Sequence, residues 1–133
     1  MGLILDTSVL IASERRGGSI DVILEQALAL HGETEIGLSA VSVVELTHGI
    51  YRAKSDSDRD RRRVFSRKAF HDPLTLEIAE LPGKIEGEQA ARGNTIAVED
   101  LEIGVTALYL GFDVVTLNRR HFESIPGLKV LTF

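Results

Sequence analysis

The opening run Leu3-Ile4-Leu5, which ends at Asp6, constrains the fold more than any other stretch of the chain. Three apolar residues without polar alternation predict a buried strand in the centre of a parallel sheet. An acid at the carboxyl end of such a strand lies where open α/β sheets place their ligands. Asp6 could instead cap the helix that begins at Val9, because Asp is a good N-cap. The first strand alone leaves both interpretations open.

Further strands are predicted only after long intervals, at residues 35–38, 113–117 and 128–132. Strands this far apart do not form hairpins, so the alternation with helices predicts a parallel sheet covered on both faces. A helix from residue 9 ends before Gly18, and Ser19 or Asp21 caps a second helix that runs to about residue 30. The remaining helices are expected at residues 40–53, 58–70, 75–92, 98–110 and 119–124. Pro82 is expected to kink or split the helix that contains it.

Length and composition narrow the class of protein. A chain of 133 residues is in the range of one domain, so residues 1–133 are predicted to share a single core. The sequence contains no cysteine, which excludes disulfides and thiolate metal sites and suits a reducing cytoplasm. No apolar run approaches the ~20 residues needed to cross a bilayer, and no basic leader precedes the first one. We therefore expect a soluble cytoplasmic protein.

Charge is distributed unevenly along the chain. The net charge of −5 argues against a general polyanion-binding surface. Residues 51–71 nevertheless hold eight basic residues and three aspartates, so this arm carries +5 and the remainder carries −10. The arm and the helix before it are expected to form a helical hairpin, with residues 51–60 as its turn. Such an arm is either a solvated helix face or a surface for nucleic acid.

Three acids are candidates for one site. Asp6 ends a strand, Glu45 lies in a largely apolar helix, and Asp100 shares a helical stripe with small and apolar residues. Glu102 points about 160° away from Asp100, so the two cannot face the same site. A cluster of carboxylates is stable when a divalent cation neutralises it, and all-oxygen ligation suits Mg²⁺ or Mn²⁺. An acidic chain of this size offers several acid triples, so spacing alone does not select this one.

Several motifs together resemble PIN-domain proteins, and most closely the VapC toxins of bacterial toxin–antitoxin pairs. The segments that carry the resemblance are LILDTS at 3–8, SVVEL at 42–46, EDLEIGVTA at 99–107, VTLNRRHF at 115–122 and IPGL at 125–128. They occur in the order and at the spacing usual for the family.

The resemblance implies an α/β fold of three layers, α/β/α, with a central parallel sheet of about four to five strands and a protruding helical hairpin. It also implies the toxin of a type II toxin–antitoxin system. Such toxins are ribonucleases, typically dependent on Mg²⁺ or Mn²⁺, that block translation until a VapB antitoxin restrains them. The family is generally dimeric, and the Leu76/Ala79 face is compatible with helix packing against a second copy or against the core.

Carried over by position, Asp6, Glu45 and Asp100 match the metal-binding acids of the family. Thr7 or Ser8 matches the hydroxyl beside the first acid. A fourth acid common in PIN domains would fall between residues 116 and 118, where this chain has Thr116 and Asn118 instead. An amide adds no negative charge, so we expect one metal, with Asn118 either orienting water or phosphate or serving as a plain turn residue.

Candidate RNA contacts come from two places, the basic arm and the last short helix. They are Arg52, Arg59, Arg62, Arg63, Arg119 and Arg120. His48 and His121 are more typical of packed, hydrogen-bonded residues than of ligands. Two other functions stay open: a catalytically silent PIN module that only binds a partner, and a phosphatase of the haloacid-dehalogenase kind. The phosphatase requires a second acid two residues after Asp6, where this chain has Ser8.

Overall fold

The computed structural model describes residues 2–16, 20–68, 70–71 and 74–132. In this part of the chain the strands are β1 (Gly2–Leu5), β2 (Glu35–Leu38), β3 (Phe70–His71), β4 (Asp113–Val115) and β5 (Val130–Leu131). The helices are α1 (Thr7–Arg15), α2 (Ile20–His31), α3 (Ala40–Arg52), α4 (Asp56–Lys68), α5 (Leu76–Ala91), α6 (Val98–Leu110) and α7 (Arg119–Phe122). No described helix has the length and apolar character to cross a membrane.

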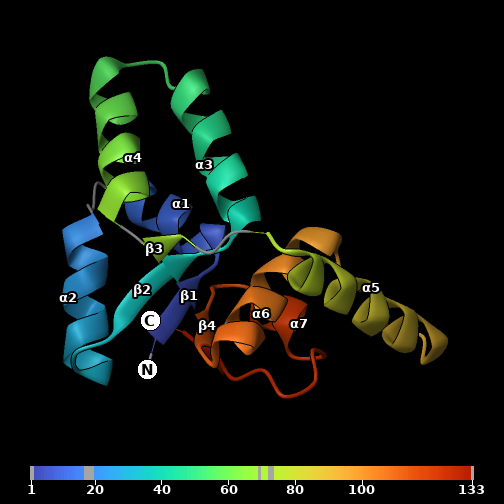
Figure 1. Ribbon diagram of the computed structural model, residues 1–133. Helices are drawn as coiled ribbons and strands as arrows, with labels where there is room; N and C mark the ends of the chain where they lie inside the picture. Colours follow the sequence, from blue (N-terminus) through green and yellow to red (C-terminus); the bar gives the residue numbers. More distant parts are fainter. Residues whose placement is uncertain (1, 17–19, 69, 72–73, 133) are drawn as a thin grey trace.

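The strands form one parallel sheet in the order β3-β2-β1-β4-β5. β1 is the central strand, as predicted, and it pairs with β2 on one side and β4 on the other (Figure 1). Helices cover both faces of the sheet, which confirms the three-layer α/β/α architecture. Because β1 and β4 are neighbours, the residues that follow each strand meet at the carboxyl edge of the sheet.

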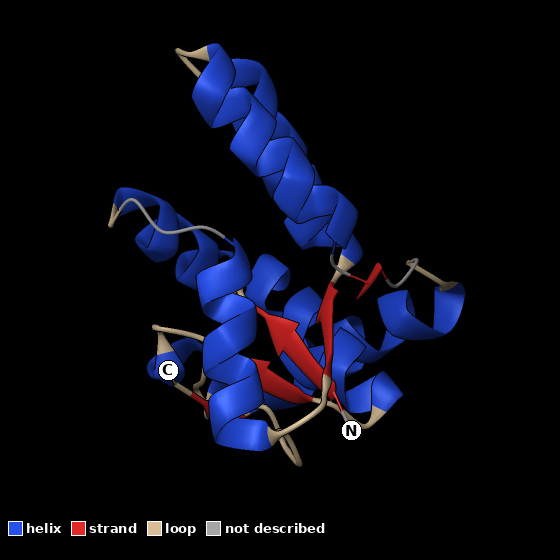
Figure 2. Ribbon diagram, turned by 90° about the vertical axis from the view of Figure 1, so that its left-hand side faces the viewer, coloured by secondary structure: helices blue, strands red, loops and turns tan. Residues whose placement is uncertain are grey.

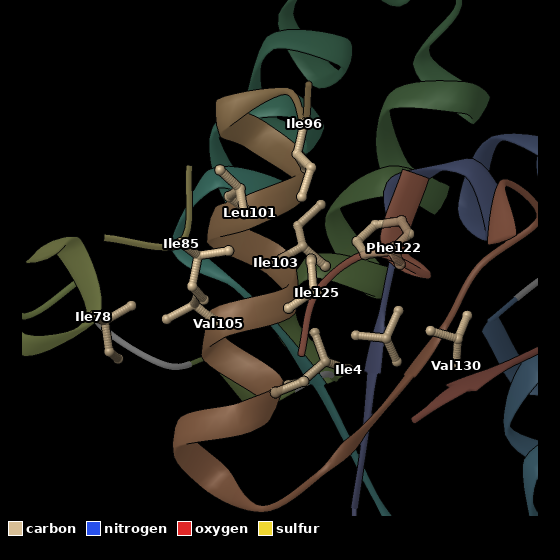
Figure 3. Close-up of a cluster of buried hydrophobic side chains, with 12 residues drawn as sticks. Ile4, Ile78, Ile85, Ile96, Leu101, Ile103, Val105, Phe122, Ile125 and Val130 are labelled. Atoms are coloured by element: carbon tan, nitrogen blue, oxygen red, sulfur yellow. The ribbon is translucent and has the colours of Figure 1, made fainter. Parts of the chain in front are cut away.

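The opening strand is apolar without alternation because both of its faces are buried. Leu3 and Leu5 pack with α1, α2 and α3, in a cluster that also contains Val9 and Leu46. Ile4 points to the other face, where its neighbours come from α5, α6 and α7 (Figure 3). A strand with a core on each side cannot alternate apolar and polar residues.

α6 approaches the last turn of the chain closely through Gly104. A Cβ added there would lie 2.6 Å from Cδ1 of Ile125 and 3.2 Å from Cδ2 of Leu128. Ile125 is fully buried, so the side chain has little room to move away. The missing side chain thus lets α6, which carries Asp100, pack against the segment after α7.

α3 and α4 form the predicted hairpin, which projects away from the sheet (Figure 2). Ser39 is the N-cap of α3, and its hydroxyl accepts a hydrogen bond from the amide of Ser42. Arg62 fastens the hairpin to the body: Nε and Nη2 donate to Oε1 of Glu14 in α1 at 2.9 and 2.6 Å, and Nη1 donates to the carbonyl of Gly49. The middle of α4 is therefore joined both to α1 and to α3.

Some predicted boundaries are wrong. The turn of the hairpin is residues 53–55, shorter than expected, and residue 70 belongs to β3 rather than to the preceding helix. Asp21 lies inside α2 and does not cap it, while Gly18 and Ser19 lie outside the described residues. β4 ends at Val115, although the amide of Thr116 continues the ladder to the carbonyl of Leu131 at 3.0 Å.

Two helices differ from expectation in what they bury. α3 is not largely buried, since Val44 is 67% and Tyr51 76% exposed. α5 is one uninterrupted helix through Pro82, so the proline does not split it. The residues that α5 buries are Ile78, Pro82, Ile85 and Gln89. Leu76 is 74% exposed, so the Leu76/Ala79 face is not a core face.

Candidate functional site

Asp6 occupies the end of the central strand with its side chain almost fully buried, at 6% exposure. Its backbone lies at the N-cap position of α1, but its carboxylate makes no capping hydrogen bond. Instead Oδ2 accepts hydrogen bonds from Oγ of Ser8 and from Oγ1 of Thr116, both at 2.7 Å. The carboxylate is held by hydroxyls at the edge of the sheet, and the capping interpretation of its side chain does not apply.

The same hydroxyls also hold the chain that follows β4. The amide of Leu117 donates to Oγ of Ser8 at 3.2 Å, and the amide of Asn118 donates to Oγ1 of Thr116 at 2.9 Å. The end of β1 and the loop after β4 therefore form one hydrogen-bonded unit. Asn118 itself is exposed and stands at the N-cap of α7 without a side-chain capping bond.

Glu45 of α3 lies close enough to Asp6 for the charge of Asp6 to act on its carboxyl group. Burial raises the pKa of its carboxyl group, the Thr7 hydroxyl counteracts this by hydrogen bonding, and the charges of Asp6, Glu99 and Asp100 raise it further. A carboxylate whose charge raises the pKa of a neighbouring carboxyl group lies close enough to repel it. Oγ1 of Thr7 also lies 3.5 Å from Oγ of Ser42.

Asp100 lies in the first turn of α6 with its side chain 18% exposed. Burial raises its pKa, His121 lowers it, and Asp6 and Glu99 raise it. Nδ1 of His121 lies 3.1 Å from Oδ2 of Asp100. The pKa of Glu102 is raised by burial alone, without any contribution from the other acids. The structure thus brings Asp100, and not Glu102, toward Asp6.

The carboxylates of this site have the right chemistry for a metal ion but not the spacing. Its donors are carboxylate oxygens whose charges repel, which is the chemistry that a divalent cation relieves. Among the residues that the structure describes, however, no group of three or more His, Asp or Glu side chains stands close enough to hold an ion. The charge of Asp6 acts on both Glu45 and Asp100. The three carboxylates are nevertheless too far apart to coordinate one ion directly.

A cleft of about 610 Å³ lies between α1, α3 and α4 and reaches one of the three acids, Glu45. Thr7 and Glu45 line it, together with Glu14, Asp58 and Arg62. In Figure 1 α1 lies below the two helices of the hairpin, and Asp58 and Arg62 of α4 carry the lining of the cleft onto the basic arm. A chain-like ligand in the cleft would lie against both the arm and Glu45.

The candidate RNA-binding arginines fall into two groups. Arg62 is bound to Glu14, Arg119 donates to the carbonyl of Val130 at 2.8 Å, and Arg59 pairs with Asp56 at 3.3 Å. These guanidinium groups already have partners within the fold. The exposed residues of the second group are Arg52, Arg63 and Arg120.

Two residues near the acids were not predicted as part of the site. Glu99 was not among the predicted site residues, yet its charge acts on both Asp100 and Glu45. His121 is hydrogen-bonded, as predicted, but its partner is Asp100 and its side chain is 55% exposed rather than packed. The one sequence signal for His121 is its position three residues after Asn118. This spacing places the two residues on the same side of a short helix.

Comparison with known proteins identifies the family. The PIN domain matches residues 3–128. The ribonuclease VapC of Rickettsia bellii (strain RML369-C) is 34% identical over 136 residues, covering 99% of this chain and 96% of that protein. Ribonuclease VapC1 of Rickettsia felis (strain ATCC VR-1525 / URRWXCal2) is 32% identical over the same length and coverage.

Solved structures agree on the fold. A chain of VapBC2 from Rickettsia felis, bound to a DNA fragment from its promoter, superposes with a TM-score of 0.83 at 20% identity, over 100% of this chain and 99% of that one. VapBC-1 from nontypeable Haemophilus influenzae gives a TM-score of 0.83 at 21% identity, over 99% and 98% of the two chains. The chain therefore belongs to the PIN-domain family, within its VapC group.

Proposed function

We propose that this protein is a divalent-metal-dependent endoribonuclease and the toxin of a type II toxin–antitoxin pair. Relatives of similar length carry the name ribonuclease VapC, which supports the activity. The observation that carries the proposal is the electrostatic coupling of Asp6, Glu45 and Asp100 at the carboxyl edge of the sheet. Burial and the charge of Asp6 raise the pKa of both Glu45 and Asp100, a cost to stability that a functional role explains.

Mg²⁺ or Mn²⁺ would be held by Asp6, Glu45 and Asp100. Water would fill most of the coordination sphere, as Mg²⁺ usually requires and as the open spacing of the acids demands. When bound, such an ion lowers the pKa of a water molecule and stabilises charge on a phosphodiester. Ser8 and Thr116 fix the orientation of the Asp6 carboxylate, and Thr7 supports Glu45.

RNA would reach the acids along the cleft between α1, α3 and α4. Asn118 is exposed beside Thr116 and would orient the phosphate or the attacking water. Arg52, Arg63 and Arg120 are the arginines best placed for phosphate contacts, because Arg59, Arg62 and Arg119 already have partners in the fold. Phosphate contacts of this kind weaken as salt increases.

A VapB-type antitoxin would occupy the same cleft and the hairpin above it. Solved structures that share this fold include a toxin–antitoxin complex from Klebsiella pneumoniae, which supports such a partner. The protein would act in the cytoplasm, where its lack of cysteine is no disadvantage. We also propose a homodimer, because the Leu76/Ala79 face of α5 is exposed and apolar.

A catalytically silent binding module is the second candidate. It is favoured by Asn118 at the place of the fourth acid and by the open spacing of the described acids. The phosphatase alternative has weaker support, because it requires a second carboxylate at the position of Ser8. Ser8 has only a hydroxyl, which donates a hydrogen bond to Asp6.

Cleavage of single-stranded RNA by the purified protein, with and without Mg²⁺ or Mn²⁺, tests the proposal. Asp6→Asn should lower the rate by at least about 100-fold, because it removes a charge that the ion requires. Glu102→Gln is the matched control, since its carboxyl group lies on α6 but is not coupled to the other acids. Equal cleavage by wild type and Asp6→Asn, or no cleavage by either in the presence of metal, would favour the silent module.

A further inference from the structure

The segment from Thr116 to His121 is tied to the acidic site at both of its ends. Its first residue, Thr116, donates to Oδ2 of Asp6 at 2.7 Å. Its last residue, His121, places Nδ1 3.1 Å from Oδ2 of Asp100. Asn118 lies between the two ties and is the polar residue at the position of the family's fourth acid.

The first tie is made by side chains that also bind the backbone of the segment. Oγ of Ser8 donates to Asp6 and accepts the amide of Leu117 at 3.2 Å. Oγ1 of Thr116 donates to Asp6 and accepts the amide of Asn118 at 2.9 Å. Each hydroxyl therefore links the carboxylate to one backbone amide, so the position of the loop depends on the position of Asp6.

The second tie fixes the other end of the segment. The amide of His121 donates to the carbonyl of Asn118 at 2.9 Å, which closes the first turn of α7. The imidazole of the same residue then reaches Asp100 on α6. His121 is 55% exposed, so burial does not hold the ring in place and the contact with Asp100 must do so.

We propose that Ser8 and His121 are positioning residues that fasten residues 116–121 to Asp6 and Asp100, and so set where the side chain of Asn118 stands. This inference rests on the proposed metal site for its functional meaning. The ties themselves exist without metal. Because the two ties involve acids that would hold the proposed ion, metal binding would be coupled to the placement of Asn118.

Amide hydrogen exchange of the metal-free protein tests the ties directly. Ser8→Ala should speed exchange at Leu117 by about tenfold, which corresponds to the loss of one hydrogen bond. His121→Ala should speed exchange at Asn118 and at residue 121 by a similar factor. Ser8→Thr and His121→Asn keep a donor at the same place and should restore slow exchange. If Ser8→Ala does not fold, Ser8→Cys, with its weaker donor, replaces it.

Binding of Mn²⁺, followed by the electron paramagnetic resonance of the free ion, gives the second readout. Mn²⁺ should slow exchange at Leu117 and Asn118 in the wild type, and this response should be lost in His121→Ala and restored in His121→Asn. Unchanged exchange in both alanine variants would overturn the inference. If Asp6→Asn binds Mn²⁺ as tightly as the wild type, the proposed metal site is wrong. The positioning role of Ser8 and His121 is then tested only by amide exchange in the metal-free protein.

Discussion

Glu45 and Asp100 are carboxyl groups whose pKa values are raised in the folded protein, chiefly by burial and then by neighbouring acids. In the unfolded chain both return to ordinary values. A raised folded pKa contributes stability that is present at low pH and is lost as pH rises through the folded pKa. At neutral pH the site therefore costs the metal-free protein part of its stability.

The metal-free protein should melt at a higher temperature near pH 5 than near pH 7, as Glu45 and Asp100 take up protons. Glu45→Gln should raise the melting temperature at pH 7 by about 1–3 °C and flatten this pH dependence. Glu102→Gln should change the melting temperature less, because its carboxyl group is not coupled to the other acids. A thermal scan at both pH values checks this. A melting temperature that falls on acidification in the wild type would contradict it.

A single site residue could be predicted where the geometry of its own helix determines which way its side chain points. The helical spacing alone separated Asp100 from Glu102, since it depends only on 100° per residue. Glu99 and His121 were not assigned, because their roles depend on how α6 and α7 pack across the sheet edge. The partner of Arg62, Glu14, lies 48 positions away in the sequence, a pairing that no local pattern reveals.

At the scale of the element, two glycines in or next to helices should respond in opposite ways to alanine. Gly111 ends α6 with φ of 70°, a left-handed conformation that favours glycine. Gly111→Ala should destabilise the protein by about 1 kcal/mol. Gly83 lies inside α5 with open space where a Cβ would be, so Gly83→Ala should stabilise it by up to about 1 kcal/mol. Urea unfolding of the two variants measures both, and shifts of the same sign would contradict the argument.

The contact between Arg62 of α4 and Glu14 of α1 joins the hairpin to the rest of the protein. Arg62→Gln removes the charge that joins α4 to Glu14 of α1. We expect a loss of about 1 kcal/mol, since the pair is partly exposed and solvent weakens it. Faster amide exchange should be confined to α4 and the end of α3. Arg63→Gln, an exposed neighbour on the same helix, is the control and should leave exchange unchanged.

Most helices and strands were predicted to within a few residues, because each has a clear apolar period and an end signal such as Gly111 or Ser39. β3 was missed because two residues are too short for any periodicity. Pro82 was expected to kink or split α5, but the residue is buried and the helix continues on both sides of it. Packing there outweighs the missing hydrogen bond.

On the scale of the whole molecule, the proposed homodimer predicts that the Leu76/Ala79 face of α5 does not tolerate a large side chain. Gly87 lies on the same side of the helix as Leu76, about 20° away, with open space where a Cβ would be, so Gly87→Arg causes no clash within one copy. We expect Gly87→Arg to shift the protein toward the monomer in light scattering. Glu88→Arg is the control, because residue 88 lies about 100° around the helix. A wild-type protein that is monomeric at all concentrations would end the proposal.

The overall architecture was predictable because strands separated by helices leave few topologies open to a parallel sheet. The central place of β1 followed from its unbroken apolar run. Which face α5 and α3 turn to the core was not predictable. Both helices are apolar or small over more than one side, and only the assembled core distinguishes Ile78 from Leu76.

The hydrogen bond between Thr116 and Asp6 joins residues separated by 110 positions. At the usual speed of protein synthesis, 5–20 residues per second, roughly 5 to 20 s pass between the appearance of the first partner and that of the second. A nascent chain on the ribosome thus carries its first acid long before the loop that holds it. The proposed site is therefore assembled last, and under the proposed function a growing chain is expected to be inactive until it is nearly complete.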